Sequence, residues 1–593
     1  MIFRNAFVAL TLLLVTAVSH AAPAITPAET QSQRLNALFE ADWQRQLRDS
    51  PMTASYVGDP RYNARLPDRS PAAIAAQHAA VRTSLATLED IDRSTLAASD
   101  QLNFDIYRAL LEDTIAGFGF RTEWMPVDHQ GGIHSFAVSA TQVLRFATPR
   151  DYRDWTARLR GYGTLTDQTI ALMREGMRSG WMPPRAIMSR VPAQIAEQAN
   201  AAPESSSFYA PFAKMPASIA TAEQTMLRAD GRAAVTGVVI PALKRFQAFF
   251  NDEYLPVTRK SIAAGDLPEG RAYYDYLARS YTTTTLSADE IHRIGLKEVA
   301  RIRGEMEKIR EEVEFNGDLS AFFVHLRTDP KFFHASPDAL LTAYRALTRR
   351  IDPELVKVFG KLPRTPYGVV PIPASNAPDT TTAYYNGPAA DGSRAGNYYV
   401  NLYKPESRPI WEMLSLSLHE AVPGHHLQIA LALEQPDLPM FRRMSSFTAY
   451  VEGWGLYAER LGYDMGLYDD PYDRMGQLAY EMWRAVRLVV DTGMHAKDWS
   501  RDRAIAYFKD NAPKTEQDIV NEIDRYIGTP GQALAYKIGQ LRISDLRARA
   551  EGKLGEGFDL RAFHDELLST GAVPLSVMEQ RMDVWIAARA AEQ

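Results

Sequence analysis

Residues 411–428 read WEMLSLSLHEAVPGHHLQ, a stretch that joins an apolar helix-forming segment to a cluster of histidines. The apolar spacing from Trp411 to Leu418 predicts a helix that packs on the core. Three of the chain's 12 His stand at positions 419, 425 and 426. A His-Glu pair on a helix followed by another His is typical of zinc sites, in which the His bind the metal and the Glu activates a water. The stretch therefore predicts a metal site on a helix.

The spacing of these histidines requires a break in that helix. In the common HExxH pattern the second His follows the first by four residues, but this position is Pro423. On an unbroken helix His425 would point roughly 120° away from His419, and His426 would lie about 10.5 Å along the axis. The Pro423-Gly424 step predicts a break that would bring His425 back toward His419, with His426 as the substitute ligand. The alternative is an ordinary helix with exposed His that stops at Pro423.

A third metal ligand is predicted in the segment AYVEGWGLYAERL, residues 449–461. Glu452 follows His425 by 27 residues, which leaves room for a turn and a returning antiparallel helix. The small residues Ala449 and Gly455 would let that helix approach another closely. Glu459, two turns further on, either supports a ligand or is a solvated surface carboxylate.

Polar residues recur at helical spacing in an otherwise apolar segment: Arg484, Arg487, Asp491 and His495. Asp491 and His495 stand four apart, as in an orienting carboxylate–imidazole pair, and His495 would then assist catalysis. Arg487 would bind a substrate carboxylate through two hydrogen bonds. A buried structural ion network is an equally good interpretation of any one of these residues.

Two further segments complete the candidate site. Thr529-Pro-Gly-Gln532 predicts a helix over residues 533–541. Tyr536 on this helix would donate its phenol hydrogen to a developing oxyanion. The alternative is that Tyr536, as a lone Tyr, only packs in the core. Residues 381–385 and 397–402, rich in Thr, Tyr and Val, predict a hairpin with a long loop, which would accept substrate backbone as an added strand. The remaining candidates for substrate binding are Arg394, Tyr398 and Lys537.

Composition limits the class of protein. The chain has 593 residues, 46% hydrophobic and 23% charged, so it can bury a large core. Its formal net charge of −6 argues against a nucleic-acid-binding protein, which would normally show a basic stripe. The absence of Cys excludes disulfides, thiolate zinc sites and cysteine nucleophiles. Any metal ligands must therefore be His and carboxylates.

The N-terminus predicts export. Arg4, the apolar run 6–18 and a small-x-small site ending at Ala21 form the pattern of a signal peptide, residues 1–21. The mature chain is expected to be periplasmic or secreted, with no membrane anchor after signal removal. We expect a helical N-terminal region, 22–370, that forms a channel wall, and a metal-binding catalytic region, 371–593, within one continuous body.

These motifs together resemble the bacterial domain-of-unknown-function 885 family. The resemblance is carried by HEAVPGHHLQ (419–428), AYVEGWGLYAERL (449–461), RLVVDTGMHAKDWS (487–500) and TPGQALAYKIGQ (529–540), and it extends upstream to residues 287–303 and 391–401. That family is similar to gluzincin-type metallopeptidases of the oligopeptidase and carboxypeptidase kind. The similarity implies a large, mainly α body with a deep channel, and a small β hairpin or sheet beside the metal site. It implies one Zn²⁺ ion and these roles: His419, His425 and Glu452 as ligands, Glu420 as catalytic base, and Tyr536 as oxyanion donor.

The sequence therefore predicts an exported zinc-dependent peptidase that hydrolyses small or unfolded peptides with a metal-activated water and a Glu general base. Two alternatives stay open. One is a metal-dependent hydrolase of non-peptide amides or esters that uses the same site, and the other is a non-catalytic exported binding protein. A peptide is the expected partner, nucleic acid is not, and the oligomeric state is left undetermined.

Overall fold

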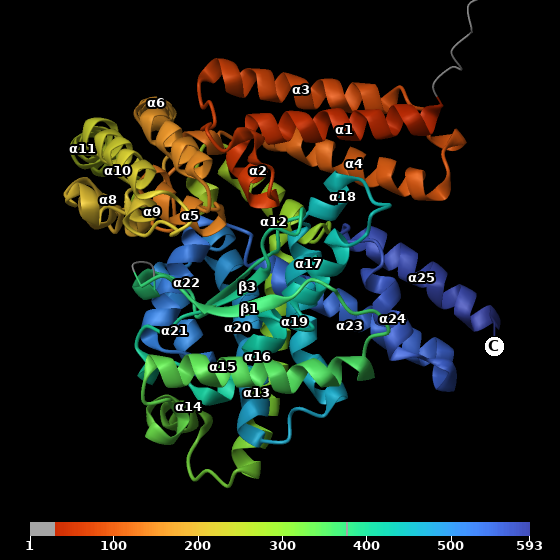
Figure 1. The fold of residues 1–593 in the computed structure, drawn as a ribbon. Coiled ribbons are helices and arrows are strands. Elements are labelled where there is room, and N and C mark those ends of the chain that lie inside the picture. Colours follow the sequence, from red (N-terminus) through yellow and green to blue (C-terminus); the bar gives the residue numbers. More distant parts are fainter. Residues whose placement is uncertain (1–29, 375–376, 593) are drawn as a thin grey trace, which may run out of the picture.

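The computed structural model describes residues 30–374 and 377–592. The predicted signal peptide, residues 1–21, lies outside the described residues. Apart from three short strands, the described elements are helical (Figure 1), which confirms the prediction of a mainly α protein.

The first eleven α-helices occupy the upper part of the molecule in the view of Figure 1. Helices α1 to α4 lie together at the top, and α6 and α8 to α11 gather beside them. The bounds are α1 (Gln31–Asp49), α2 (Pro51–Val57), α3 (Pro71–Glu89), α4 (Ala98–Gly117), α5 (Phe136–Val143), α6 (Pro149–Ser179), α7 (Arg185–Met188), α8 (Val191–Ala199), α9 (Ala210–Ala213), α10 (Thr221–Ala234) and α11 (Ile240–Phe249).

One helical run in this region, Thr221–Val257, is the one among the described residues that is long and apolar enough to cross a membrane, judged by length and composition alone. It contains α10 and α11, which pack against α6. Leu243 and Phe246 of this run are fully buried in the core. Core helices of soluble proteins pass the same test, so the run by itself is weak evidence for a membrane segment.

The remaining helices include α20, which contacts α12, α13, α16, α19, α21, α22 and α23. Their bounds are α12 (Gly270–Thr282), α13 (Ala288–Glu312), α14 (Leu319–Thr328), α15 (Pro337–Ile351), α16 (Met413–Glu420), α17 (His425–Leu433), α18 (Met440–Met444), α19 (Thr448–Met465), α20 (Pro471–Ala496), α21 (Arg501–Asn511), α22 (Glu516–Gly528), α23 (Leu534–Leu554), α24 (Leu560–Leu568) and α25 (Leu575–Glu592).

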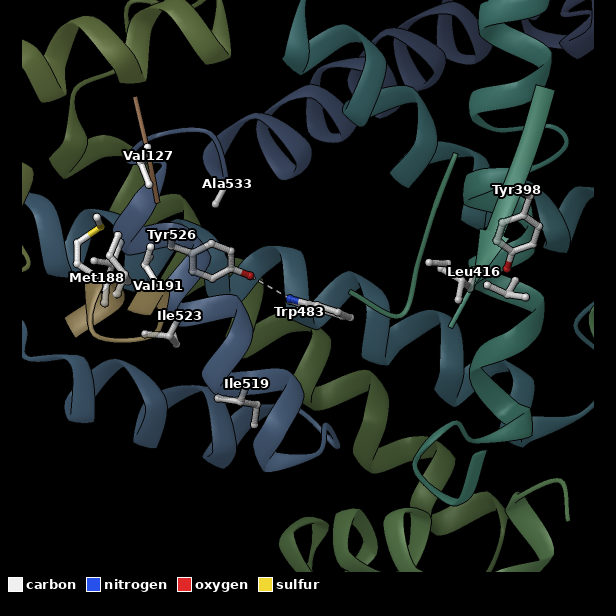
Figure 2. Packing of buried hydrophobic residues seen from close by; sticks show 14 of the residues in the cluster. Val127, Met188, Val191, Tyr398, Leu416, Trp483, Ile519, Ile523, Tyr526 and Ala533 are labelled. Atoms are coloured by element: carbon white, nitrogen blue, oxygen red, sulfur yellow. Dashed lines mark hydrogen bonds between the residues drawn. The ribbon is translucent and has the colours of Figure 1, made fainter. Parts of the chain in front are cut away.

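Helix α20 is buried on all sides from Met475 to His495 and contacts α13, α16 and α23. A helix that is buried all round belongs to the centre of a large core. Its Trp483 donates an indole hydrogen bond of 3.0 Å to the hydroxyl of Tyr526 on α22, in the apolar packing shown in Figure 2. Polar side chains on α20 therefore face other helices or the internal pocket described below.

The sheet has the strand order β1-β3-β2, with β1 (Tyr367–Pro371), β2 (Ala383–Asn386) and β3 (Gly396–Val400). Strands β2 and β3 pair antiparallel with Tyr385 opposite Tyr398, which confirms the predicted hairpin. Strand β1, which pairs parallel with β3, was not predicted. Its segment is rich in Pro, a residue that sheets accept only at edges, and β1 is an edge strand that ends at Pro371.

Close helix contacts fix the walls around the site. Helices α19 and α23 meet backbone to backbone, since a Cβ added to Gly453 would lie 2.5 Å from the Cα of Gly539. This approach holds Glu452 of α19 near Tyr536 of α23. The predicted helix after Gln532 begins at Leu534, one residue later than expected.

Candidate metal centre

The helix that carries His419 breaks at the predicted step. Helix α16 ends at Glu420 and α17 begins at His425, so the four residues between them belong to neither helix. A Cβ on Gly424 would lie 1.9 Å from the carbonyl oxygen of His419, which only Gly avoids. The break therefore exists, and it lets His425 turn back toward His419.

Three side chains converge beside this break. Each of His419, His425 and Glu452 offers one ligand atom, and these atoms all lie within 4.8 Å of one another. Oε2 of Glu452 lies 3.6 Å from Nε2 of His419 and 3.3 Å from Nε2 of His425. Both His are buried, and Glu452 is partly buried. The structure thus brings together the three side chains predicted as metal ligands.

The other ring nitrogen of His419 is held by Glu459. Nδ1 of His419 lies 2.8 Å from Oε1 of Glu459. Glu459 also accepts a hydrogen bond from the hydroxyl of Ser415 through its Oε2, and its Oε1 lies 3.3 Å from the guanidinium of Arg484. Glu459 is fully buried, so it is a supporting residue and not a solvated surface carboxylate. A carboxylate on Nδ1 fixes the tautomer that leaves the Nε2 lone pair toward Glu452. Gly455 makes room for this ring, because a Cβ there would lie 2.8 Å from Nε2 of His419.

Burial and mutual attraction set the ionisation of the cluster. Burial lowers the pKa of His419, but hydrogen bonds to Glu452 and Glu459 outweigh it and raise this pKa to about 9. Burial also disfavours the charged form of Glu452, yet the two imidazoles hold its pKa well below the ordinary value. Burial raises the pKa of Glu420, while His419 and His425 oppose the shift.

His426 faces away from the cluster. Its Nδ1 lies 2.8 Å from the hydroxyl of Tyr385 and its Nε2 lies 3.0 Å from the carbonyl oxygen of Thr365. Burial lowers its pKa to about 4, so the ring is neutral. Both ring nitrogens are engaged by the sheet region, which favours His425 over His426 as the ligand.

A cavity of about 260 Å³ opens onto the cluster. Its lining includes all three candidate ligands, the candidate base Glu420 and the candidate oxyanion donor Tyr536. Burial and the nearby Glu452 raise the pKa of Tyr536, so its phenol keeps its proton at neutral pH. The same cavity is lined by residues 380–385, which run into strand β2. The hairpin therefore lies beside the candidate site, as predicted.

The polar stripe of α20 divides into two parts. Arg484 and Arg487 line the cavity, whereas Asp491 and His495 do not. The predicted Asp491–His495 pair does not form: Asp491 accepts hydrogen bonds from the hydroxyl of Tyr274 at 2.6 Å and from a backbone amide at 3.1 Å. His495 accepts from the backbone amide of residue 264 and faces the carbonyl oxygen of residue 526, each at 3.0 Å. These two side chains join α20 to neighbouring segments because each finds a closer partner there.

The three remaining substrate-binding candidates lie outside the residues that line the cavity. Arg394 donates to the backbone carbonyls of residues 56, 143 and 387. Tyr398 is fully buried, with its ring packed edge-on against Tyr344. Lys537 is fully buried in a network of ion pairs. Each is engaged by the protein itself, and the structure does not bring these side chains to the metal cluster.

The charged residues of the cavity that were not predicted include Glu522 and Arg525, both on α22. No motif marks them in the sequence. Their only signal is position, since α22 ends directly before the Thr529-Pro-Gly-Gln532 turn that leads to Tyr536.

Fold and site together define a mainly helical protein with a buried His/His/Glu cluster at a cavity. A family model described as "Bacterial protein of unknown function (DUF885)" matches residues 51–582, and the chain belongs to this family. The family resemblance seen in the sequence is thereby confirmed, while the description gives no activity.

Two solved structures share this fold. One is described as "The crystal structure of the putative lipoprotein from Colwellia psychrerythraea"; it is 29% identical, with a TM-score of 0.89 over 94% of this chain and 100% of that chain. The other, from Shewanella oneidensis, is described as a "putative lipoprotein of unknown function", with 20% identity, a TM-score of 0.70 and the same coverage, and it shows the fold alone. None of the curated proteins matches this chain.

Proposed function

We propose that the protein is an exported zinc-dependent peptidase that acts on short or unfolded peptides. The observation that carries this proposal is the convergence of two imidazole nitrogens and one carboxylate oxygen beside a cavity. Neutral imidazole nitrogens and carboxylate oxygens present lone pairs, so only a cation or a shared proton can lie between them. A divalent metal would bind all three at once and would displace the proton that the carboxylates of Glu452 and Glu459 otherwise favour on His419.

The donor set and its dimensions fit zinc. Two His and one carboxylate form a known catalytic zinc set, which leaves a fourth position open for water or substrate. With metal–ligand distances of about 2.0–2.2 Å, ligands of a tetrahedral site lie about 3.4 Å apart. The distances of 3.3 and 3.6 Å from Glu452 to the two imidazoles agree with this value. No Cys competes for the metal, because the chain has none.

A divalent ion at this site would acidify a water and polarise the substrate carbonyl. The side chains of the protein then move the protons. Glu420 accepts the proton that the water loses as its oxygen bonds to the carbonyl carbon, and returns this proton to the amine nitrogen as the C–N bond breaks. Tyr536 donates its phenol hydrogen to the carbonyl oxygen as negative charge develops there.

The sheet supports a peptide as the substrate. Strand β2 is an outer strand of the sheet, and residues 380–385 line the cavity. An extended peptide would add its backbone to this edge while its scissile carbonyl reaches the metal cluster. The proposal includes the similarity to gluzincins, with the cavity as the floor of a channel that excludes folded proteins.

Export is supported by the signal-peptide pattern and by the description of the 29%-identical structural relative as a "putative lipoprotein". We therefore propose a periplasmic or secreted protein.

The test is metal analysis of purified protein followed by mass spectrometry of a digested peptide mixture. We expect one zinc per chain and peptide cleavage that a chelator abolishes. Glu420→Gln should keep the zinc and lose turnover by about 10²–10⁴-fold, the usual contribution of a general base. Glu406→Gln, at an exposed position in the segment between β3 and α16, is the matched control and should keep full activity. Cleavage of only esters or non-peptide amides would support the alternative hypothesis of a metal-dependent hydrolase of non-peptide substrates. Absence of both zinc and chelator-sensitive activity would support the hypothesis of a non-catalytic binding protein.

A further inference from the structure

The same cavity has a second charged region, formed by arginines of α20 and α22. Arg487 lies on α20 and Arg525 on α22, and both line the cavity. Both contact a single carboxylate, Glu522, with nitrogen–oxygen distances of 3.0 Å. Glu522 is buried and carries one charge against two guanidinium groups. Arg487, Arg525 and Glu522 therefore have one positive charge in excess.

The other charged groups in this part of the cavity are paired elsewhere. Asp518 pairs with Arg408 at 3.2 Å, and Arg190 pairs with Asp524 at 3.3 Å. Asp524 is shared with a further guanidinium, that of Arg501, at 2.7 Å. These neighbours add no acidic group to offset the excess charge of Arg487 and Arg525. This part of the cavity is thus suited to an anion.

Arg487 also has an unused hydrogen-bond donor. Its side chain is 5% exposed, and among the residues that the structure describes its Nη1 has no hydrogen-bond partner. Buried guanidinium nitrogens are normally paired, because an unpaired donor loses its hydration without compensation. Its Nε donates to the hydroxyl of Tyr526 at 2.8 Å, and its guanidinium lies 4.2 Å from the ring centre of Tyr536. The guanidinium is therefore held in place, and the two N–H groups of Nη1 have no acceptor among the described residues.

The position of the two arginines relative to the His/His/Glu cluster limits the class of anion that could bind there. Tyr536 contacts Arg487 with its ring and lines the cavity together with the candidate metal ligand Glu452. A molecule that reaches both regions must be an anion at one end and carry a hydrolysable bond at the other. The excess of one charge matches a carboxylate, which is a monoanion, better than a phosphate dianion. An arginine pair also suits the planar geometry of a carboxylate.

We propose that Arg487 and Arg525 bind the C-terminal carboxylate of a short peptide, so that the enzyme cuts at a fixed distance from the C-terminus. This inference rests on the proposed peptidase function. It selects Arg487 from the three basic candidates that the sequence offered for a carboxylate, because Arg394 and Lys537 lie outside the cavity lining. It adds Arg525, which no motif indicated.

The experiment compares two peptides of identical sequence, one with a free C-terminal carboxylate and one with a C-terminal amide, on the zinc-loaded wild-type protein. We expect kcat/KM to be about 10–100-fold higher for the free carboxylate, as for the loss of a charge-assisted hydrogen bond. In peptides lengthened at the N-terminus the cut should stay at the same distance from the C-terminus. Equal cleavage of both peptides overturns the carboxylate site and leaves the peptidase proposal intact, whereas cleavage of neither peptide overturns both.

Variants then assign the effect to the arginines. Arg487→Met should lower kcat/KM for the free peptide more than for the amide, so that the ratio of the two values falls toward one. Arg349→Met, at an exposed position of α15, is the control and should keep the preference. A preference that persists in a folded Arg487→Met protein, shown by an unchanged circular dichroism spectrum and zinc content, would contradict the assignment.

Discussion

Two buried clusters of ionisable side chains lie on neighbouring helices of this protein. They differ in whether every hydrogen-bonding group has a partner within the protein. In the closed cluster, Nζ of Lys537 lies 2.8 Å from Glu481, 2.8 Å from Gln540 and 3.0 Å from Glu298. An ammonium group has three hydrogens, and here each has an acceptor. Lys537 is fully buried, so this cluster joins α13, α20 and α23 without contact to the cavity.

The open cluster has the opposite property. His419, His425 and Glu452 converge beside the cavity, and no Lys or Arg among the described residues pairs with Glu452. Burial and charge alone therefore do not identify a binding site. A network in which every donor has an acceptor stabilises the fold. A group of His and Glu side chains that converges on a cavity without a Lys or Arg indicates a binding site for a cation.

The largest effect on the closed cluster is expected for Lys537→Met. Glu481 and Glu298 share two cations, Lys537 and Arg301. Loss of the fully buried one should lower the free energy of unfolding by about 3 kcal/mol, the lower end of the cost of breaking a buried ion pair, because Arg301 still pairs with both carboxylates. Denaturant titration measures the loss. Lys553→Met, at an exposed position of the same helix, should change stability by less than about 0.5 kcal/mol. If Lys537→Met kept its stability and instead lost peptide binding, Lys537 would belong to the substrate site after all.

A smaller effect is expected for Glu459→Gln, which sharpens the account of the open cluster. The amide keeps the shape of the side chain but removes the negative charge from Nδ1 of His419, so zinc affinity should fall by about 10–100-fold. Competition with a zinc-binding dye measures this affinity. The exposed Glu406→Gln variant should bind zinc like the wild type. An unchanged affinity in Glu459→Gln would show that the carboxylate only packs against the ring.

The sequence predicted the local features of the His/His/Glu cluster well. Pro423 and Gly424 predicted the break, because proline and glycine interrupt a helix through their own backbone chemistry. Glu452 was predicted from its separation from His425 and its small neighbours, which allow a close helix pair. These features depend on residues near each other in sequence.

Features that depend on distant partners could not be predicted in this way. Spacing places Asp491 and His495 on one face of α20, but it does not say that Tyr274 and residue 526 will bind them. The periodicity of the sequence likewise did not predict that Arg525 lines the cavity. The position of Arg525 follows from the packing of α22 against α20. Sequence spacing gives the face of a helix, whereas the partner across that face is set by tertiary structure.

His425 and His426 show the same limit at the smallest scale. Successive residues on a helix point about 100° apart, so two adjacent His at the start of α17 must face different surroundings. The backbone break decides which of them faces Glu452, and the sequence left His426 as a substitute. In the structure His425 lies 3.3 Å from Glu452, while His426 contacts Tyr385.

The central claim is tested most directly by the zinc content of His425→Ala and His426→Ala, measured side by side on folded, purified protein. We predict that His425→Ala loses the zinc and that His426→Ala retains about one ion per chain, because only His425 reaches the cluster. Loss of zinc in His426→Ala alone, or full zinc in both variants, would contradict the metal centre described here.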